Sequence, residues 1–353
     1  MIAHNRYSLL KEANHSNTHL SFIKPKLVKQ ESFHIRKDSK CLTKDTEKDD
    51  KENKPANTTE PSSPLKKMPS ETMLQTLKDR DLTDIELQNV TSFKEYGQNI
   101  LSYLKEYEKK FPTDVCLSKH EITSTLRAKM VDWMIEVLTN FKCRDLTLYL
   151  AVKIMDRFCK ACTTSKKISD LHIIGVASMF IASKYEDIYP LRMQMVYEKI
   201  AHKKITIESI KQMEREIMAA LGSTLGIPTT FEFIRIYIKY IPPNEFSQFV
   251  EQMSFYLAKV CLHDYQFCGY KSALTSASCI YVAFKICEQL NKVTMIDKEL
   301  VSTLCGLSSQ TEAVLMECSQ KVLHNAQNFE KQFTGLENLK KTHFVNLANF
   351  LNK

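Results

Sequence analysis

The stretch SDLHIIGVASMFIASKYED, residues 169–187, is apolar on nearly every side of a helix. Its large apolar residues are Leu171, Ile173, Ile174, Val176, Met179, Phe180 and Ile181. A helix without a polar face is stable only at the centre of a bundle, where other helices cover it. Small residues that would let these neighbours pack closely are Gly175, Ala177, Ser178, Ala182 and Ser183. The stretch therefore predicts an all-α fold built around a central helix.

Amphipathic segments on both sides of the central stretch predict two sets of helices. The first set covers residues 121–141, 144–162, 169–187, 192–201 and 207–222, with Thr123, Asp145, Ser169 and Thr206 as expected N-caps. The second set covers residues 230–241, 244–265, 270–290, 297–306 and 311–329. Both sets follow one helix near residues 91–112, which Thr91 or Ser92 would cap and Pro112 would end. Within it Tyr96, Ile100, Tyr103, Leu104 and Tyr107 recur at helical spacing.

The two sets share local sequence, which indicates an internal repeat. YLAVKIMDRF from Tyr149 is similar to YLAKVCLHDY from Tyr256. SMFIASK from Ser178 is similar to CIYVAFK from Cys279. We therefore expect two copies of one five-helix unit.

Composition agrees with a helical protein and excludes several functions. Only 7 Gly and 10 Pro occur in 353 residues, whereas sheet-rich folds use more Gly at turns. No uninterrupted apolar run is long enough for a membrane span, and the N-terminus lacks a secretory core. We expect an intracellular protein whose 11 Cys are reduced. The net charge of +8 is spread along the chain without a dense basic stripe, so nucleic-acid binding is not expected.

No catalytic motif is present: the sequence lacks a Gly-rich phosphate loop, HExxH, GxSxG and the protein-kinase motif set. The CxxC at Cys159–Cys162 has no second pair at zinc-ribbon spacing, so it predicts neither a metal nor a redox site. We expect a protein that is not an enzyme and uses no cofactor or metal.

Two features suggest a role in binding. Leu126, Met130 and Trp133 form a second apolar stripe beside the core face of their helix. The stripe either faces another helix of the bundle or forms an exposed groove for a short peptide. Lys184 ends the central apolar helix, where it either complements the helix dipole or meets a carboxylate, for which Glu214 is the candidate.

The segments LRAKMVDWMIEV, LTLYLAVKIMDRF and IASKYEDIYP closely resemble the cyclin box of mitotic cyclins, and the resemblance spans about residues 92–330. PTTFEFIR is similar to the B-type pattern, with A-type as the alternative. The resemblance implies two tandem five-helix cyclin folds after an N-terminal helix and a disordered tail. The expected boundaries are 1–90 for the tail, 91–226 for the N-terminal cyclin box and 227–353 for the C-terminal fold.

The resemblance also implies roles for single residues. Lys184, Tyr185 and Glu214 would contact a cyclin-dependent kinase beside its regulatory C-helix. Arg127 and Asp156 would form an internal ion pair. The patch that docks RxL-type substrate proteins would consist of Leu126, Met130, Trp133, Glu136, Leu171 and His172. The chain departs from the family pattern at His172 (usually Gln), Leu191 (usually Pro) and Ser223 (Phe in A-type cyclins).

The tail carries short motifs that resemble regulatory signals. Between Thr43 and Pro64 the only apolar residue is Ala56, which predicts disorder. Lys51, Glu52 and Asn53 resemble a KEN box, and Arg6, Leu9 and Asn14 fit a destruction box, RxxLxxxxN. Both motifs would bring the anaphase-promoting ubiquitin ligase. Ser63-Pro64 fits a proline-directed phosphorylation site or an ordinary turn-rich linker.

The resulting prediction is a regulatory subunit that binds and activates a cyclin-dependent kinase, as a heterodimer in the nucleus and cytoplasm, for G2/M control. The rival is a transcription factor built on the same repeat, such as TFIIB. That rival would carry an N-terminal zinc ribbon and a basic DNA-facing surface, and neither pattern occurs in the sequence.

Overall fold

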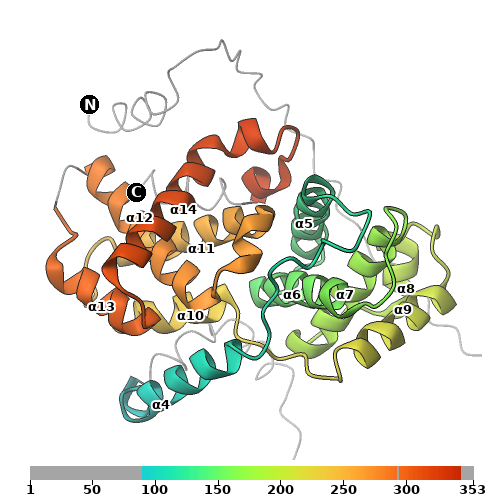
Figure 1. Ribbon diagram of the computed structural model, residues 1–353, viewed down its shortest axis with the longest axis horizontal. Coiled ribbons are helices and arrows are strands. Elements are labelled where there is room, and N and C mark those ends of the chain that lie inside the picture. The colour runs from blue at the N-terminus through green and yellow to red at the C-terminus, as the bar shows by residue number, and fades with distance from the viewer. Residues whose placement is uncertain (1–89, 292–293, 343–353) are drawn as a thin grey trace, which may run out of the picture. The chain divides into compact units, whose positions relative to one another are not determined.

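The computed structural model describes residues 90–291 and 294–342, with side chains from Tyr96 onward, and these residues contain helices but no strand (Figure 1). The described residues from Ser92 onward all belong to one compact unit. The expected tail therefore lies outside the described residues, together with Arg6, Leu9, Asn14, Lys51, Glu52, Asn53 and Ser63. None of the described helices has both the length and the apolar character that crossing a bilayer requires.

The first set of helices follows the predicted order. It comprises α5 (Ser124–Asn140), α6 (Asp145–Ala161), α7 (Asp170–Glu186), the short α8 (Met193–Met195), a π-helical turn at Val196–Ile200, and α9 (Ile207–Ala220). Figure 1 shows these helices in green and yellow on one side of the drawing. The all-helical fold that the sequence predicted is thus confirmed.

Three of the four expected N-caps in this set are confirmed in position, and Asp145 is wrong. Thr123 accepts the backbone N–H of Leu126, and Thr206 accepts that of Ser209. Asp145 is instead the first residue of α6, and its carboxylate binds Lys259 of α11 at 2.8 Å. Ser169 occupies the cap position of α7, but its side chain makes no capping hydrogen bond.

Helix α7 is the centre of the first unit, as its composition predicted. Its residues from Ile174 to Ser183 are all buried. Gly175 lies against Met130 of α5, and a Cβ atom at this position would force the Met130 sulfur to shift. The lack of a side chain at Gly175 thus leaves room for Met130 between α5 and α7.

The second set repeats the first. It comprises α10 (Thr230–Ile238), α11 (Ser247–His263), a 3₁₀ turn at Tyr265–Gly269, α12 (Ser272–Asn291), α13 (Lys298–Ser308) and α14 (Glu312–Gln332), drawn from yellow through orange to red in Figure 1. The segments that are similar in sequence occupy equivalent helices: α6 corresponds to α11, and α7 to α12. Like α7, α12 is buried over most of its length.

Helix α4 (Val90–Glu108) precedes both sets and packs on the second one. It begins at Val90, so the prediction that Thr91 or Ser92 caps it is wrong. Leu101 is buried in the core of the second unit. Tyr96, Ile100 and Tyr103 lie on the opposite face, with 55%, 44% and 62% of their surface exposed. The helical spacing of these three residues therefore marks a surface and not a core contact.

Candidate protein-binding site

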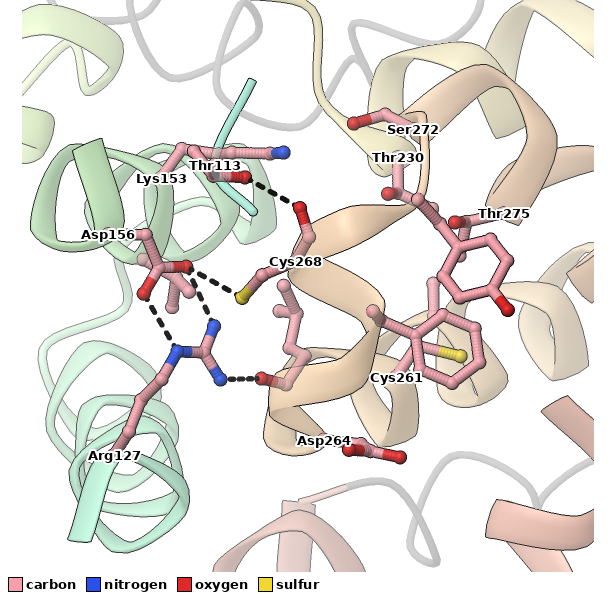
Figure 2. Close-up of a pocket in the computed structure, with 15 residues that line it drawn as sticks. Thr113, Arg127, Lys153, Asp156, Thr230, Cys261, Asp264, Cys268, Ser272 and Thr275 are labelled. Carbon is pink, nitrogen blue, oxygen red and sulfur yellow. Dashed lines mark hydrogen bonds and ion pairs between the residues drawn. The ribbon is translucent and has the colours of Figure 1, made fainter. Parts of the chain in front are cut away.

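A buried ion pair fixes the framework of the candidate site. Arg127 on α5 donates to both carboxylate oxygens of Asp156 on α6, with Nε–Oδ1 and Nη2–Oδ2 both 2.7 Å (Figure 2). The third donor, Nη1, binds the backbone oxygen of Leu262 on α11 at 2.8 Å. Arg127 and Asp156 are only 2% and 3% exposed. Such a pair is stable in the interior because each charge has a partner and directed hydrogen bonds.

Two cysteine thiols lie close to the Asp156 carboxylate. The Sγ atoms of Cys116 and Cys268 lie 3.9 and 3.6 Å from the oxygens of Asp156, and Cys268 and Asp156 line a cavity of about 40 Å³. A hydrogen bond with Cys268 and burial both raise the pKa of Cys116, so its thiol stays protonated. Arg127 already neutralises Asp156. These side chains are therefore arranged as a satisfied core and not as a set of open metal ligands.

Lys184 and Glu214 form an ion pair on the surface of the first unit. Lys184 comes from the last turn of α7 and Glu214 from the middle of α9. The Lys184 ammonium also lies 4.2 Å from the ring centre of Phe180. The side chains of Lys184 and Glu214 are 39% and 21% exposed. Of the two interpretations of Lys184, the structure shows the carboxylate contact, and the pair remains open to solvent.

Large apolar side chains follow this ion pair along the chain. Tyr185, Ile188 and Tyr189 are 55%, 71% and 82% exposed. The Tyr185 hydroxyl lies against Gly226 in the segment between the two units, so a Cβ atom at Gly226 would displace this hydroxyl. Exposed aromatic and aliphatic side chains next to a charge pair are typical of protein–protein contact surfaces.

Leu191 departs from the family pattern for a structural reason. Its backbone N–H donates to the Ser183 hydroxyl at 2.9 Å, and its side chain is buried. Proline has no N–H and could not make this bond. Ser223, the third departure, has a positive φ of 59°, as does its neighbour Gly222.

The apolar stripe on α5 is shared between core and surface. Leu126 and Trp133 are half-buried, whereas Met130 is buried against Gly175 of α7. Trp133 meets the ring of His172 edge-on, with the ring centres 5.1 Å apart. Each of the two alternatives thus holds for part of the stripe. Met130 packs inside the helix bundle, whereas Leu126 and Trp133 are partly accessible to solvent.

The other predicted members of the patch differ in exposure. Leu171 is buried, and Glu136 is exposed one turn after Trp133. Burial lowers the pKa of His172, and the nearby charges of Lys204 and His202 lower it further. The imidazole is therefore neutral at physiological pH and extends the apolar edge.

One part of this surface had no signal in the sequence. Asn338, beyond the end of α14, donates to Asp132 at 3.0 Å and to Glu136 at 3.2 Å, both on α5. The backbone N–H of Leu339 also donates to Asp132, at 3.3 Å. These partners are more than 200 residues apart along the chain. Local periodicity carries no information about such contacts.

Comparison with known proteins identifies the class first. Residues 99–226 match the profile of the cyclin N-terminal domain, and residues 228–344 match that of the cyclin C-terminal domain. A solved viral cyclin from herpesvirus saimiri has the same fold, with a TM-score of 0.55 and 18% identity, covering 68% of this chain and 99% of that chain. The fold is therefore that of two cyclin domains in tandem.

Relatives then give the family. The G2/mitotic-specific cyclin S13-7 of Glycine max is 32% identical over 59% of this chain and 76% of its own length. The G2/mitotic-specific cyclin-B of Marthasterias glacialis is 31% identical over 73% of this chain and 63% of its own. Cyclin-B1-1 of Arabidopsis thaliana is 28% identical over 74% of this chain and 58% of its own. The chain belongs to the cyclin family, among the mitotic cyclins with a cyclin box.

Proposed function

We propose that this chain is a B-type mitotic cyclin: a non-catalytic regulatory subunit that binds and activates a cyclin-dependent protein kinase for G2/M control. The observation that carries the proposal is the solvent-accessible Lys184–Glu214 pair, flanked by exposed Tyr185, Ile188 and Tyr189. In such an arrangement the charge pair can orient the partner protein, and the apolar side chains supply surface that becomes buried on binding. The domain matches and the mitotic relatives support the same function.

Activation follows from differential binding to two kinase conformations. A ligand shifts a conformational equilibrium only by its difference in affinity for the two states. A rigid surface on α7 and α9 that fits the active position of the kinase C-helix would favour that position. The kinase's Glu would then reach its ATP-positioning Lys. A durable complex of this kind buries on the order of 2,000 Å² or more.

The stripe on α5 serves substrate recruitment in this proposal. Leu126 and Trp133 offer apolar contact area, and Glu136 offers a negative charge one turn away. The complementary ligand is a short peptide with apolar residues and a nearby basic residue, as in RxL-type substrate proteins. Met130 and Leu171 would support this surface from beneath.

Regulated destruction completes the proposal. The KEN box at Lys51–Asn53 and the destruction box from Arg6 to Asn14 would recruit the anaphase-promoting ubiquitin ligase, and the complex would act in nucleus and cytoplasm. The support is the sequence pattern alone. We do not propose the transcription-factor alternative, because the matched domains and relatives are cyclins.

The test is kinase stimulation by the full chain. Lys184→Ala with Glu214→Ala should weaken binding to a purified cyclin-dependent kinase and reduce its phosphorylation of a minimal peptide. Lys321→Ala with Glu317→Ala is the matched control, because this pair is also exposed but lies on α14 of the second unit. Equal stimulation by wild type and a folded Lys184/Glu214 variant would remove this surface from the mechanism.

A further inference from the structure

The segment from Phe333 to Thr342 follows the last helix of the second unit and packs on the first. Leu339 is fully buried and Phe333 is 9% exposed, and both belong to the hydrophobic core of the first unit. Leu336 packs against the same core. We call residues 333–342 the C-terminal strap. Its apolar residues thus pack into the core of the first unit.

Hydrogen bonds to α5 fix the position of the C-terminal strap along that helix. Asp132 of α5 accepts the side-chain amide of Asn338 at 3.0 Å and the backbone N–H of Leu339 at 3.3 Å. The backbone N–H of Asn338 also donates to Asp132 at 3.4 Å, and His263 of α11 lies 3.4 Å from the same carboxylate. Asp132 is 3% exposed. Its buried carboxylate therefore holds the strap without help from Glu136.

The bond from Asn338 to Glu136 is additional to this anchor. The same Nδ2 atom that binds Asp132 lies 3.2 Å from Glu136 Oε2. Glu136 is exposed, and an exposed Glu on a helix ordinarily populates several rotamers. The amide holds one carboxylate oxygen and leaves the other oxygen and further lone pairs available to a ligand. Glu136 is thus held in place three residues after Trp133, on the same side of the helix.

We propose that Asn338 is a positioning residue for peptide docking: it holds the Glu136 carboxylate where the basic residue of a peptide can pair with it while apolar residues contact Leu126 and Trp133. The inference rests on the proposed docking function of α5 and adds a residue from the other end of the chain. A carboxylate held in advance loses less conformational entropy when the ligand binds. Asn338 itself need not touch the peptide.

The test compares two peptides that differ in one charge. The first carries arginine and leucine in an RxL arrangement, and the second has citrulline, a neutral isostere, in place of arginine. Binding to the full chain is measured by fluorescence anisotropy. Asn338→Ala should weaken binding of the arginine peptide by about 3- to 10-fold, the range that corresponds to the net contribution of one ordinary hydrogen bond. It should leave the affinity for the citrulline peptide within about 2-fold.

Control variants separate positioning from folding. Asn338→Ser removes the amide that contacts both carboxylates but keeps the backbone N–H that donates to Asp132 at 3.4 Å, so it should behave as Asn338→Ala does. Lys341→Ala changes an exposed residue of the same strap that pairs with Glu337, and it should bind both peptides as wild type does. Thermal unfolding of each variant shows whether the strap remains packed.

Each outcome decides between the two proposals. If Asn338→Ala weakens both peptides equally, Asn338 has a structural role only and the inference is wrong. The inference also fails, while docking stands, if Trp133→Ala abolishes binding but Asn338→Ala binds both peptides like wild type. If wild type binds the arginine peptide no better than Trp133→Ala does, docking on α5 fails and the inference fails with it.

Discussion

Glu108, the last residue of α4, caps the N-terminus of α12 by accepting the backbone N–H of Ser272. Its second oxygen lies 3.4 Å from the backbone nitrogen of Ala273. Lys105 of the same helix donates to Ser309 Oγ at 2.7 Å. The Glu108 bonds connect the helix before the repeat to α12, the central helix of the second unit, and the Lys105 bond connects it to the C-terminal end of α13. The first residues of α12 thus obtain their hydrogen-bond partner from another helix.

Replacing Glu108 by alanine should lower the free energy of unfolding by about 1–2 kcal/mol, the usual loss for a helix cap. The backbone N–H groups of Ser272 and Ala273 would be left without their acceptor in a buried place. Urea unfolding at pH 7 measures the effect. Glu106→Ala is the control: it removes an exposed carboxylate of the same helix that pairs with Lys109, and it should leave the unfolding midpoint unchanged.

Glu108 should also make stability depend on pH. Burial raises the pKa of Glu108 above its ordinary value of 4.5, although Lys153 and the N–H groups of Ser272 and Ala273 lower it in part. The folded state therefore binds the proton more tightly than the unfolded chain does. The stabilisation is complete below pH 4.5 and is lost as the pH rises through the folded-state pKa.

Glu108→Gln tests this pH dependence, because glutamine stays neutral. Urea unfolding of both proteins from pH 4 to pH 7 should show wild type losing stability relative to Glu108→Gln as the pH rises. A difference that is constant over the whole range, or that changes with the opposite sign, would contradict the assignment of a raised pKa to Glu108.

Breaking the Arg127–Asp156 pair should destabilise the protein strongly. Arg127→Ala leaves a buried carboxylate without its partner, which costs about 3–5 kcal/mol. Arg127→Met combined with Asp156→Leu removes both charges and should recover much of that loss. Urea unfolding of the single and double variants gives the comparison. If the double variant is less stable than Arg127→Ala, other contacts of these side chains dominate, such as the Arg127 bond to Leu262.

Trp133 and Met130 should give different effects when each is replaced by alanine. Trp133 is half-buried at the surface, so Trp133→Ala should reduce phosphorylation of RxL-bearing substrates and spare a minimal peptide. Met130 is buried against Gly175, so Met130→Ala should lower the free energy of unfolding by about 2–5 kcal/mol. Kinase assays with both substrates and urea unfolding separate the two effects. Equal losses on both substrates with Trp133→Ala would mean that Trp133 serves only the core.

The local sequence pattern was enough to predict the helices, their order and the internal repeat. The central position of α7 followed from its lack of a polar face, and the equivalence of α7 with α12 followed from SMFIASK and CIYVAFK. Thr123 and Thr206 cap their helices as expected because a cap depends only on residues three positions away.

Contacts between distant segments decided what could not be predicted. Asp145 looked like a cap, but Lys259, 114 residues away, binds its carboxylate. Tyr96, Ile100 and Tyr103 recur at helical spacing, but this spacing did not show that the second unit covers the other face of α4, at Leu101. In the candidate site, the pairing of Lys184 with Glu214 was foreseen from residue types. The hydrogen bond between Asn338 and Glu136 could not be predicted, because no pattern in the sequence near either residue indicates it.

Arg127 spans the boundary between the repeats with a single guanidinium, since two of its nitrogens bind α6 and the third binds α11. Separating the repeats would break the bond to α11 and admit water to a charge that is now enclosed. Opening one repeat while the other stays closed is therefore unfavourable. The backbone amides near Asp156 and Leu262 should exchange with deuterium at the same slow rate, as members of one cooperative block.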